Sequence, residues 1–247
     1  MILSELGLSK RTLRLARVSS VRAGSLKEDP AASLFCPSWV SRRGPCDTSL
    51  LSPHFLYLVK AIKTIHDTTE KTWFVTFTCY RWIPLFDITN SYDLIYNWFR
   101  ILKERSQAHV IAFVIMPNHV HCILELAEET SLNKLIANAK RFIAYEMIQR
   151  LHTIGREDIL KTLNHACSMK EVSKGQKHKV FEPSFDAKSI FTDSFLHQKI
   201  NYIHFNPISG KWNLADEFTD YYHSSAGFYE KNIMHPEVDI KHYHLIS

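Results

Sequence analysis

The sequence predicts an α+β domain in which an antiparallel sheet carries its helices on one side. Short runs of β-branched and aromatic residues, typical of buried strands, occur at 73–80, 108–116 and 119–126. Two longer segments, 91–105 and 131–151, repeat apolar residues at helical spacing. With a fourth strand and a last helix further on, the order is strand, helix, strand, strand, helix, strand, helix. This order is typical of α+β folds.

The two central strands are predicted to form a hairpin. Only Pro117 and Asn118 separate the apolar run 108–116 from the run 119–126. A connection of two residues leaves no room for a crossover, so the strands must pair antiparallel. The earlier strand, 73–80, and the helix 91–105, with Ser91 as its N-cap, precede this hairpin.

The second half of the domain is predicted from capping residues and apolar stripes. Thr130 or Ser131 caps a helix that runs to about Leu151. Residues 152–180 are polar and weakly patterned, and we interpret them as a loop or insert, followed by a short strand over 180–185. The buried stripe of the long helix contains Leu132, Leu135, Ile136, Ala139, Ile143 and Met147.

The last helix is predicted over 194–205, where Asn206 and Pro207 end it. Thr192 or Asp193 opens it, and its apolar face contains Leu196, Ile200 and Ile203. The remaining chain to Ser247 is expected to wrap the core.

Length and composition fit one catalytic domain over 53–247, with its core at about 73–229, behind an N-terminal extension. The chain has 247 residues and a net charge of +5, which suits a polyanionic partner. Residues 1–52 are rich in Ser and Arg and poor in acids, so we interpret them as an irregular extension or a misassigned start, with order beginning near 54–65.

The cysteines and the hydropathy pattern indicate where in the cell the protein is expected. The five cysteines form no C-x-x-C pair and are odd in number, which favours reduced thiols and a cytoplasmic protein. No apolar run reaches the length of a membrane span, so no membrane association is expected.

His119 and His121 are the first candidate functional residues. They are separated by one residue on a predicted strand, so their side chains share one face, about 6–7 Å apart. Val120, Cys122 and Leu124 take the other face. Two imidazoles at this spacing can hold one divalent metal ion.

Tyr202 and Asn206 are the second pair. They are four residues apart on the last helix and share a face with Gln198, away from the apolar stripe. A metal held by two imidazoles and an amide oxygen can polarise a phosphodiester, and a tyrosine hydroxyl can attack it to form a phosphotyrosine. The four residues together therefore predict a site that cuts and rejoins DNA.

The blocks Met116-Pro117-Asn118-His119-Val120-His121 and Tyr202-Ile203-His204-Phe205-Asn206-Pro207 resemble the single-tyrosine HUH transposases (the IS200-like family), and in particular the REP-associated tyrosine transposase branch. The resemblance extends over about 73–229 and includes the block 220–226. It implies a ferredoxin-like core, His119, His121 and Asn206 as ligands of Mg²⁺ or Mn²⁺, and Tyr202 as the nucleophile. It also implies cleavage of single-stranded DNA near hairpins through a 5′-phosphotyrosine, by a monomer or a homodimer.

Several residues have alternative or weaker roles. Tyr145 lies on the polar stripe of the preceding helix and is the rival nucleophile, and Gln198 is a rival ligand. His204 lies on another helical face than Tyr202, so we expect it to pack or to contact DNA. Residues 131–212 hold 13 Lys or Arg against 7 Asp or Glu, and the phosphate contacts expected among them are Lys134, Lys140, Arg141 and Lys199.

Two other functions compete with a transposase. The spacing of His119, His121 and Glu125 resembles half of a cupin metal site, although the second half is missing and glycine is scarce. The second alternative is a non-catalytic, domesticated protein that binds hairpin DNA through the same basic surface but does not cleave it.

Overall fold

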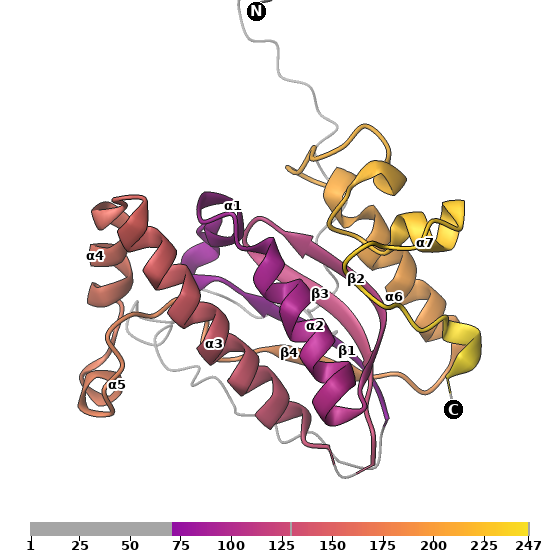
Figure 1. Ribbon diagram of the computed structural model, residues 1–247, viewed down its shortest axis with the longest axis horizontal. Coiled ribbons are helices and arrows are strands. Elements are labelled where there is room, and N and C mark those ends of the chain that lie inside the picture. Colours follow the sequence, from indigo (N-terminus) through magenta and orange to yellow (C-terminus); the bar gives the residue numbers. More distant parts are fainter. Residues whose placement is uncertain (1–70, 129, 247) are drawn as a thin grey trace, which may run out of the picture. The chain divides into compact units, whose positions relative to one another are not determined.

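The computed structural model describes residues 71–128 and 130–246 of the chain, all within one compact unit (Figure 1). The predictions for 1–52 and for 54–65 concern residues outside these ranges. The elements are β1 (Thr72–Thr78), η2 (Tyr80–Trp82), α1 (Leu85–Ile88), α2 (Tyr92–Ser106), β2 (His109–Met116), β3 (His119–Glu125), α3 (Leu132–Thr153), α4 (Glu157–His165), α5 (Met169–Ser173), β4 (Asp186–Ser189), α6 (Asp193–Phe205), η3 (Asn206–Ile208), η4 (Phe218–Asp220), α7 (Ala226–Lys231) and η5 (Tyr243–Leu245).

The four strands form one sheet in the order β2-β3-β1-β4, and every neighbouring pair is antiparallel. Helix α2 connects β1 to β2, with β3 between them, and α3 leads from β3 towards β4, with β1 between them. Two such split crossovers make the ferredoxin-like topology that the resemblance implied, and the α+β prediction is confirmed. The predicted hairpin is also confirmed, because Met116 pairs with His119 across the turn.

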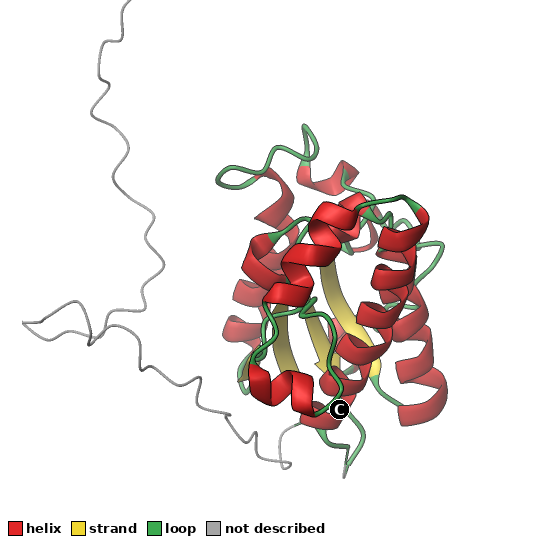
Figure 2. Cartoon of the chain, turned by 90° about the vertical axis from the view of Figure 1, so that its left-hand side faces the viewer, coloured by secondary structure: helices red, strands yellow, loops and turns green. Residues whose placement is uncertain are grey.

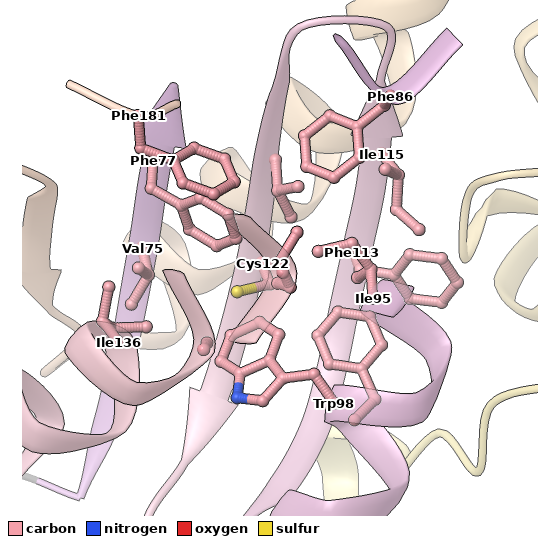
Figure 3. Packing of buried hydrophobic residues seen from close by; sticks show 14 of the residues in the cluster. Val75, Phe77, Phe86, Ile95, Trp98, Phe113, Ile115, Cys122, Ile136 and Phe181 are labelled. Carbon is pink, nitrogen blue, oxygen red and sulfur yellow. The ribbon is translucent and has the colours of Figure 1, made fainter. Parts of the chain in front are cut away.

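One face of the sheet packs against α2 and α3. Val75 and Phe77 of β1 and Cys122 of β3 point to this face and are fully buried (Figure 3). Trp98 of α2 and Ile136 of α3 pack on them, at positions of the predicted apolar stripes. Burying side chains of this size contributes on the order of 1.5–3 kcal/mol each.

The prediction that the helices lie on one side only was wrong, because α6 covers the opposite face. Figure 2 shows the strands between helices on both sides. Ile200 and Ile203 of α6 pack with Val114 of β2 and Ile123 of β3 in a second hydrophobic cluster. The near-continuous apolar sequence of β2 is the reason, since both of its faces are buried and both need a cover.

Residues 152–180 are not a loop, and the fourth strand lies later than predicted. Helices α4 and α5 occupy the segment, and α4 buries Ile159, Leu160 and Leu163. The segment 180–185 contributes one isolated bridge, between Phe181 and Cys79, whereas β4 begins at Asp186. Strand β4 reads Asp-Ala-Lys-Ser and holds its place by backbone pairing with β1, so its side chains carry no apolar signal.

Lys140 holds the connection before β4. Its ammonium group donates to the carbonyl oxygens of Glu182, Pro183 (3.3 Å) and Ser184 (3.2 Å), and the first of these bonds is 2.5 Å long. An ammonium group has three N–H donors, and the three carbonyl oxygens accept hydrogen bonds from them. Lys140 is therefore a structural residue, and the prediction that it holds phosphate was wrong.

The C-terminal chain covers the edge of the sheet at β2. Ile115 donates its backbone N–H to the carbonyl oxygen of His223 (2.9 Å), and the Tyr221 hydroxyl donates to the Ile115 carbonyl oxygen (2.8 Å). The buried Ser225 hydroxyl accepts the N–H of Phe113 (3.0 Å) and hydrogen-bonds with Nε2 of His204 on α6 (2.9 Å). An edge strand leaves N–H and C=O groups unpaired, and this segment pairs them.

No helix in the described part of the chain is both long enough and apolar enough to span a membrane.

Replacing Ser225 with Ala should lower the free energy of unfolding by about 2 to 4 kcal/mol. The change leaves the buried Phe113 N–H and His204 imidazole without this hydroxyl, and each lost buried partner costs about 1–3 kcal/mol. Denaturant unfolding, monitored by circular dichroism, measures this free energy. The exposed Ser173 of α5 is the control, and Ser173→Ala should change stability by less than about 0.5 kcal/mol. Equal effects of the two substitutions would contradict the role of Ser225.

Candidate metal and tyrosine site

His119 and His121 lie side by side on β3, on the face that α6 covers, as their spacing predicted. They are 4% and 5% exposed, and their ring centroids are 4.6 Å apart. Strand β1 flanks them, with Thr78 opposite His119 and Thr76 opposite His121. The pair therefore lies on an interior strand of the sheet, at the end of β3 that begins beside the hairpin turn.

The tautomer of His119 follows from its contact with Asn118. The Asn118 Nδ2 donates to the carbonyl oxygen of Trp82 (3.0 Å), so Oδ1 of the same amide faces Nδ1 of His119 at 2.6 Å. An amide oxygen accepts hydrogen bonds only, so His119 carries its proton on Nδ1. Its Nε2 is then the unprotonated nitrogen, as a metal ligand requires.

His121 has one satisfied nitrogen and one without a partner. Its Nδ1 is 2.7 Å from the Thr76 hydroxyl oxygen, whereas the buried Nε2 has no hydrogen-bond partner. A buried polar nitrogen without a partner costs free energy unless something binds to it. Phe74 stacks beside the ring at 5.7 Å between centroids and keeps it in place.

Both rings are neutral, which is the state that binds metal. Burial lowers the pKa of His119 to about 4, against a smaller opposing effect of the Asn206 side chain, which hydrogen-bonds to it. Burial also lowers the pKa of His121 well below its usual value, and the neighbouring His119 and Lys199 add to this. The described residues contain no group of three or more His, Cys, Asp or Glu suited to a metal.

Tyr202 and Asn206 approach the histidines from α6 and its C-cap. The Tyr202 ring lies 5.1 Å from the His121 ring, edge to face, and is 47% exposed. The Asn206 side chain hydrogen-bonds with both His119 and Tyr202. The four residues that the sequence singled out therefore meet at one place, and an amide side chain lies beside the two histidines. These donors fit a divalent metal ion.

Two charged residues, Lys199 and Asp186, lie near Tyr202. The Lys199 Nζ lies 5.3 Å from the centre of the Tyr202 ring and 4.6 Å from that of Phe74. Burial raises the pKa of Tyr202, with Asn206 opposing and Asp186 adding to the rise. The hydroxyl is therefore protonated at neutral pH, and the protein alone does not ionise it.

The other predicted residues lie elsewhere. Tyr145, Lys134 and Arg141 are on α3, which packs on the opposite face of the sheet, so they do not line this site. Tyr145 is thereby excluded as its nucleophile. Gln198 is exposed one turn before Tyr202. His204 is buried against Ser225, so its predicted role in packing is confirmed and a DNA contact is not.

Glu125 does not join the histidines. It lies four residues beyond His121 at the far end of β3, where its carboxylate accepts a hydrogen bond from the Lys241 ammonium (2.5 Å). The cupin-like pattern of the sequence therefore has no counterpart in the structure.

Sequence reasoning missed the residues that orient the ligands, Thr76 and Asn118. Asn118 was interpreted only as a turn residue, and Thr76 only as part of a strand. The available signal was the alternation of β1, which places Thr76 on the face of the histidines.

Part of the chain matches a family of known proteins. Residues 71–168 match the family described as "Transposase IS200 like". This part of the chain is therefore similar to IS200-like transposases. The match confirms the family that the sequence resembles, and it includes His119 and His121. Tyr202 and Asn206 lie beyond the matched residues.

Two solved structures are similar to this chain. One is described as "Structure of the REP associates tyrosine transposase bound to a REP hairpin", with 18% identity, a TM-score of 0.46, and coverage of 72% of this chain and 92% of that one. The other is a putative transposase from Deinococcus radiodurans R1, with 11% identity, a TM-score of 0.34, and coverage of 54% and 88%. No curated protein matches the chain in sequence.

Acid should destabilise the protein between pH 6.5 and about 4. Burial lowers the pKa of His119 and of His204 to about 4, so in this interval the unfolded chain takes up protons that the folded chain does not. The free energy of unfolding therefore falls as the pH falls. In a His204→Gln chain this loss should be smaller by on the order of 3 kcal/mol.

The measurement is denaturant unfolding at a series of pH values. The matched control is His165→Gln, because His165 is exposed on α4. That chain should keep the pH dependence of the wild type. An unchanged slope for His204→Gln would show that His204 takes up its proton in the folded state.

Proposed function

We propose that this chain is a DNA transposase that nicks and rejoins single-stranded DNA through a 5′-phosphotyrosine formed on Tyr202. The observation that carries the proposal is the position of Asn206. Its side chain bridges His119 and the Tyr202 hydroxyl, next to a buried His121 nitrogen that has no protein partner. A structural tyrosine would not need this arrangement, whereas a phosphate-cleaving site does.

The residues that would hold Mg²⁺ or Mn²⁺ are His119 and His121 through their Nε2 atoms and Asn206 through its amide oxygen. A divalent cation bound there supplies Lewis-acid polarisation of the phosphate and offsets its negative charge. Asn118 and Thr76 hold the two rings with Nδ1 occupied, so that the ligand nitrogens face the same space.

Tyr202 is the proposed nucleophile. Its hydroxyl oxygen attacks the phosphorus and loses its proton to solvent. The bond from phosphorus to the 3′ oxygen breaks, and that oxygen takes up a proton to become a free 3′-OH. The 5′ side stays on Tyr202 as a phosphotyrosine, and attack by a 3′-OH reverses the step and rejoins the strand.

The proposed substrate is single-stranded or hairpin DNA, as the sequence resemblance implies. Lys199 is the one predicted phosphate contact that lies beside Tyr202, and its ammonium is close enough to meet a phosphate there. Helix α6 packs on the sheet of its own chain, so the proposed site needs no residue from a second copy, whether or not the protein forms a homodimer.

Tyr202→Phe should abolish covalent attachment to DNA, because the change removes the attacking oxygen and keeps the ring. The assay incubates the protein and Mn²⁺ with a labelled hairpin oligonucleotide from the genomic sequence that flanks the coding region. A denaturing gel then resolves the protein–DNA adduct. Tyr145→Phe on α3 is the matched control and should form the adduct as the wild type does. Adduct formation by Tyr202→Phe would refute the assignment, and hairpin binding without any adduct would favour a non-catalytic DNA-binding protein.

His121→Ala should weaken Mn²⁺ binding at least about 100-fold, because changing an outer-shell partner alone typically costs 10–100-fold. Isothermal titration calorimetry at pH 7 measures this affinity without DNA. Asn118→Ala should weaken binding less, by roughly 10–100-fold. His165→Ala, on the exposed side of α4, should bind as the wild type does. Equal affinity of the His121→Ala and His165→Ala chains would place the metal elsewhere.

A further inference from the structure

Trp82 presents a large aromatic surface beside the histidine pair. Its side chain is 56% exposed, and its ring lies edge to face with that of the buried His119, with 5.4 Å between centroids. Trp82, His119, His121 and Tyr202 thus form a row of successive ring contacts, with the two exposed residues at its ends. Among the exposed aromatic side chains that the structure describes, these two contact the histidines.

The backbone holds Trp82 in an unfavourable conformation. Arg81 and Trp82 have φ values of 49° and 58°, in the left-handed region that costs free energy for residues other than glycine. The Trp82 N–H donates to the Cys79 carbonyl oxygen (3.0 Å), and the Trp82 carbonyl oxygen accepts from the Asn118 Nδ2 (3.0 Å). Strain of this kind gathers where a side chain is held for a function.

We propose that Trp82 is the stacking platform for one unpaired nucleobase next to the phosphate that Tyr202 attacks. This inference rests on the proposed function, which places that phosphate over the histidines. An indole face is the largest that a side chain offers a base, and stacking accepts any of the four bases. The same Asn118 amide orients His119 and holds the Trp82 backbone, so the phosphate site and the platform keep a constant spacing.

The surroundings of Trp82 fit a nucleic acid better than an apolar protein surface. Its neighbour Arg81 is exposed and forms no ion pair among the described residues. Lys211 also lies close enough to His119 for its positive charge to lower the pKa of that imidazole. A single aromatic face flanked by cations is typical of surfaces that follow a single strand, whereas protein partners need a contiguous apolar patch.

The test is a double-mutant cycle between Trp82→Leu and abasic positions in the DNA. Leucine covers His119 and keeps the backbone carbonyl that Asn118 uses, but it has no aromatic face. Anisotropy with labelled hairpin oligonucleotides that carry single-stranded flanks and Mn²⁺ measures the affinity, and each flanking nucleotide in turn is made abasic. In the wild type, one abasic position should weaken binding about tenfold, and in Trp82→Leu the same position should have no effect.

Phe142→Leu is the control, because Phe142 is 64% exposed on α3, on the other face of the sheet. That chain should respond to abasic positions as the wild type does. An equal loss at every position in wild type and Trp82→Leu would overturn the platform.

The covalent assay, run on the same samples, separates the two proposals. Adduct formation by the wild type without coupling to Trp82 would refute the platform alone. Coupling without any adduct would refute the cleavage reaction and keep Trp82 as a base-binding residue. If the wild type binds none of these oligonucleotides, both proposals fail.

Discussion

The packing of α6 on the second face of the sheet is the contact on which the candidate site depends. Ile200 and Ile203 lie against Val114 and Ile123, and this contact seals the face that carries the histidines. Burial then keeps both imidazoles neutral, since charging them there is costly. The same helix brings Tyr202 and Asn206 to them on its other side. One hydrophobic contact therefore sets both the protonation state and the geometry of the site.

The C-terminal chain supports that helix indirectly. Ser225 pairs with the backbone of β2 and also with His204, which lies between Tyr202 and Asn206 in the sequence. The edge strand, the tail and the helix are thus joined at one buried hydroxyl. The block 220–226, which contributed to the family resemblance, acts here as the cover of an open sheet edge.

Much of the fold could be predicted, because its signals are local. The hairpin at Pro117 and Asn118, the caps at Ser131 and Thr192, and the apolar stripe of α3 all follow from short-range patterns. The position of β4 and the covering of the second face of the sheet by α6 could not be predicted. The four residues of β4 have no apolar pattern. The continuous apolar sequence of β2 shows that both faces of the strand are buried, but it does not indicate which helix covers each face.

By itself, the sequence determined which side chains belong to the candidate site. The spacing of His119 and His121 places both rings on one face of a strand, and the spacing of four between Tyr202 and Asn206 places both on one face of a helix. Only the tertiary structure decided that these two faces meet and that Tyr145 and Lys140 lie away from them. It also decided that Asn118 orients His119. Periodicity acts within one element, whereas distances between elements depend on how the hydrophobic clusters pack in three dimensions.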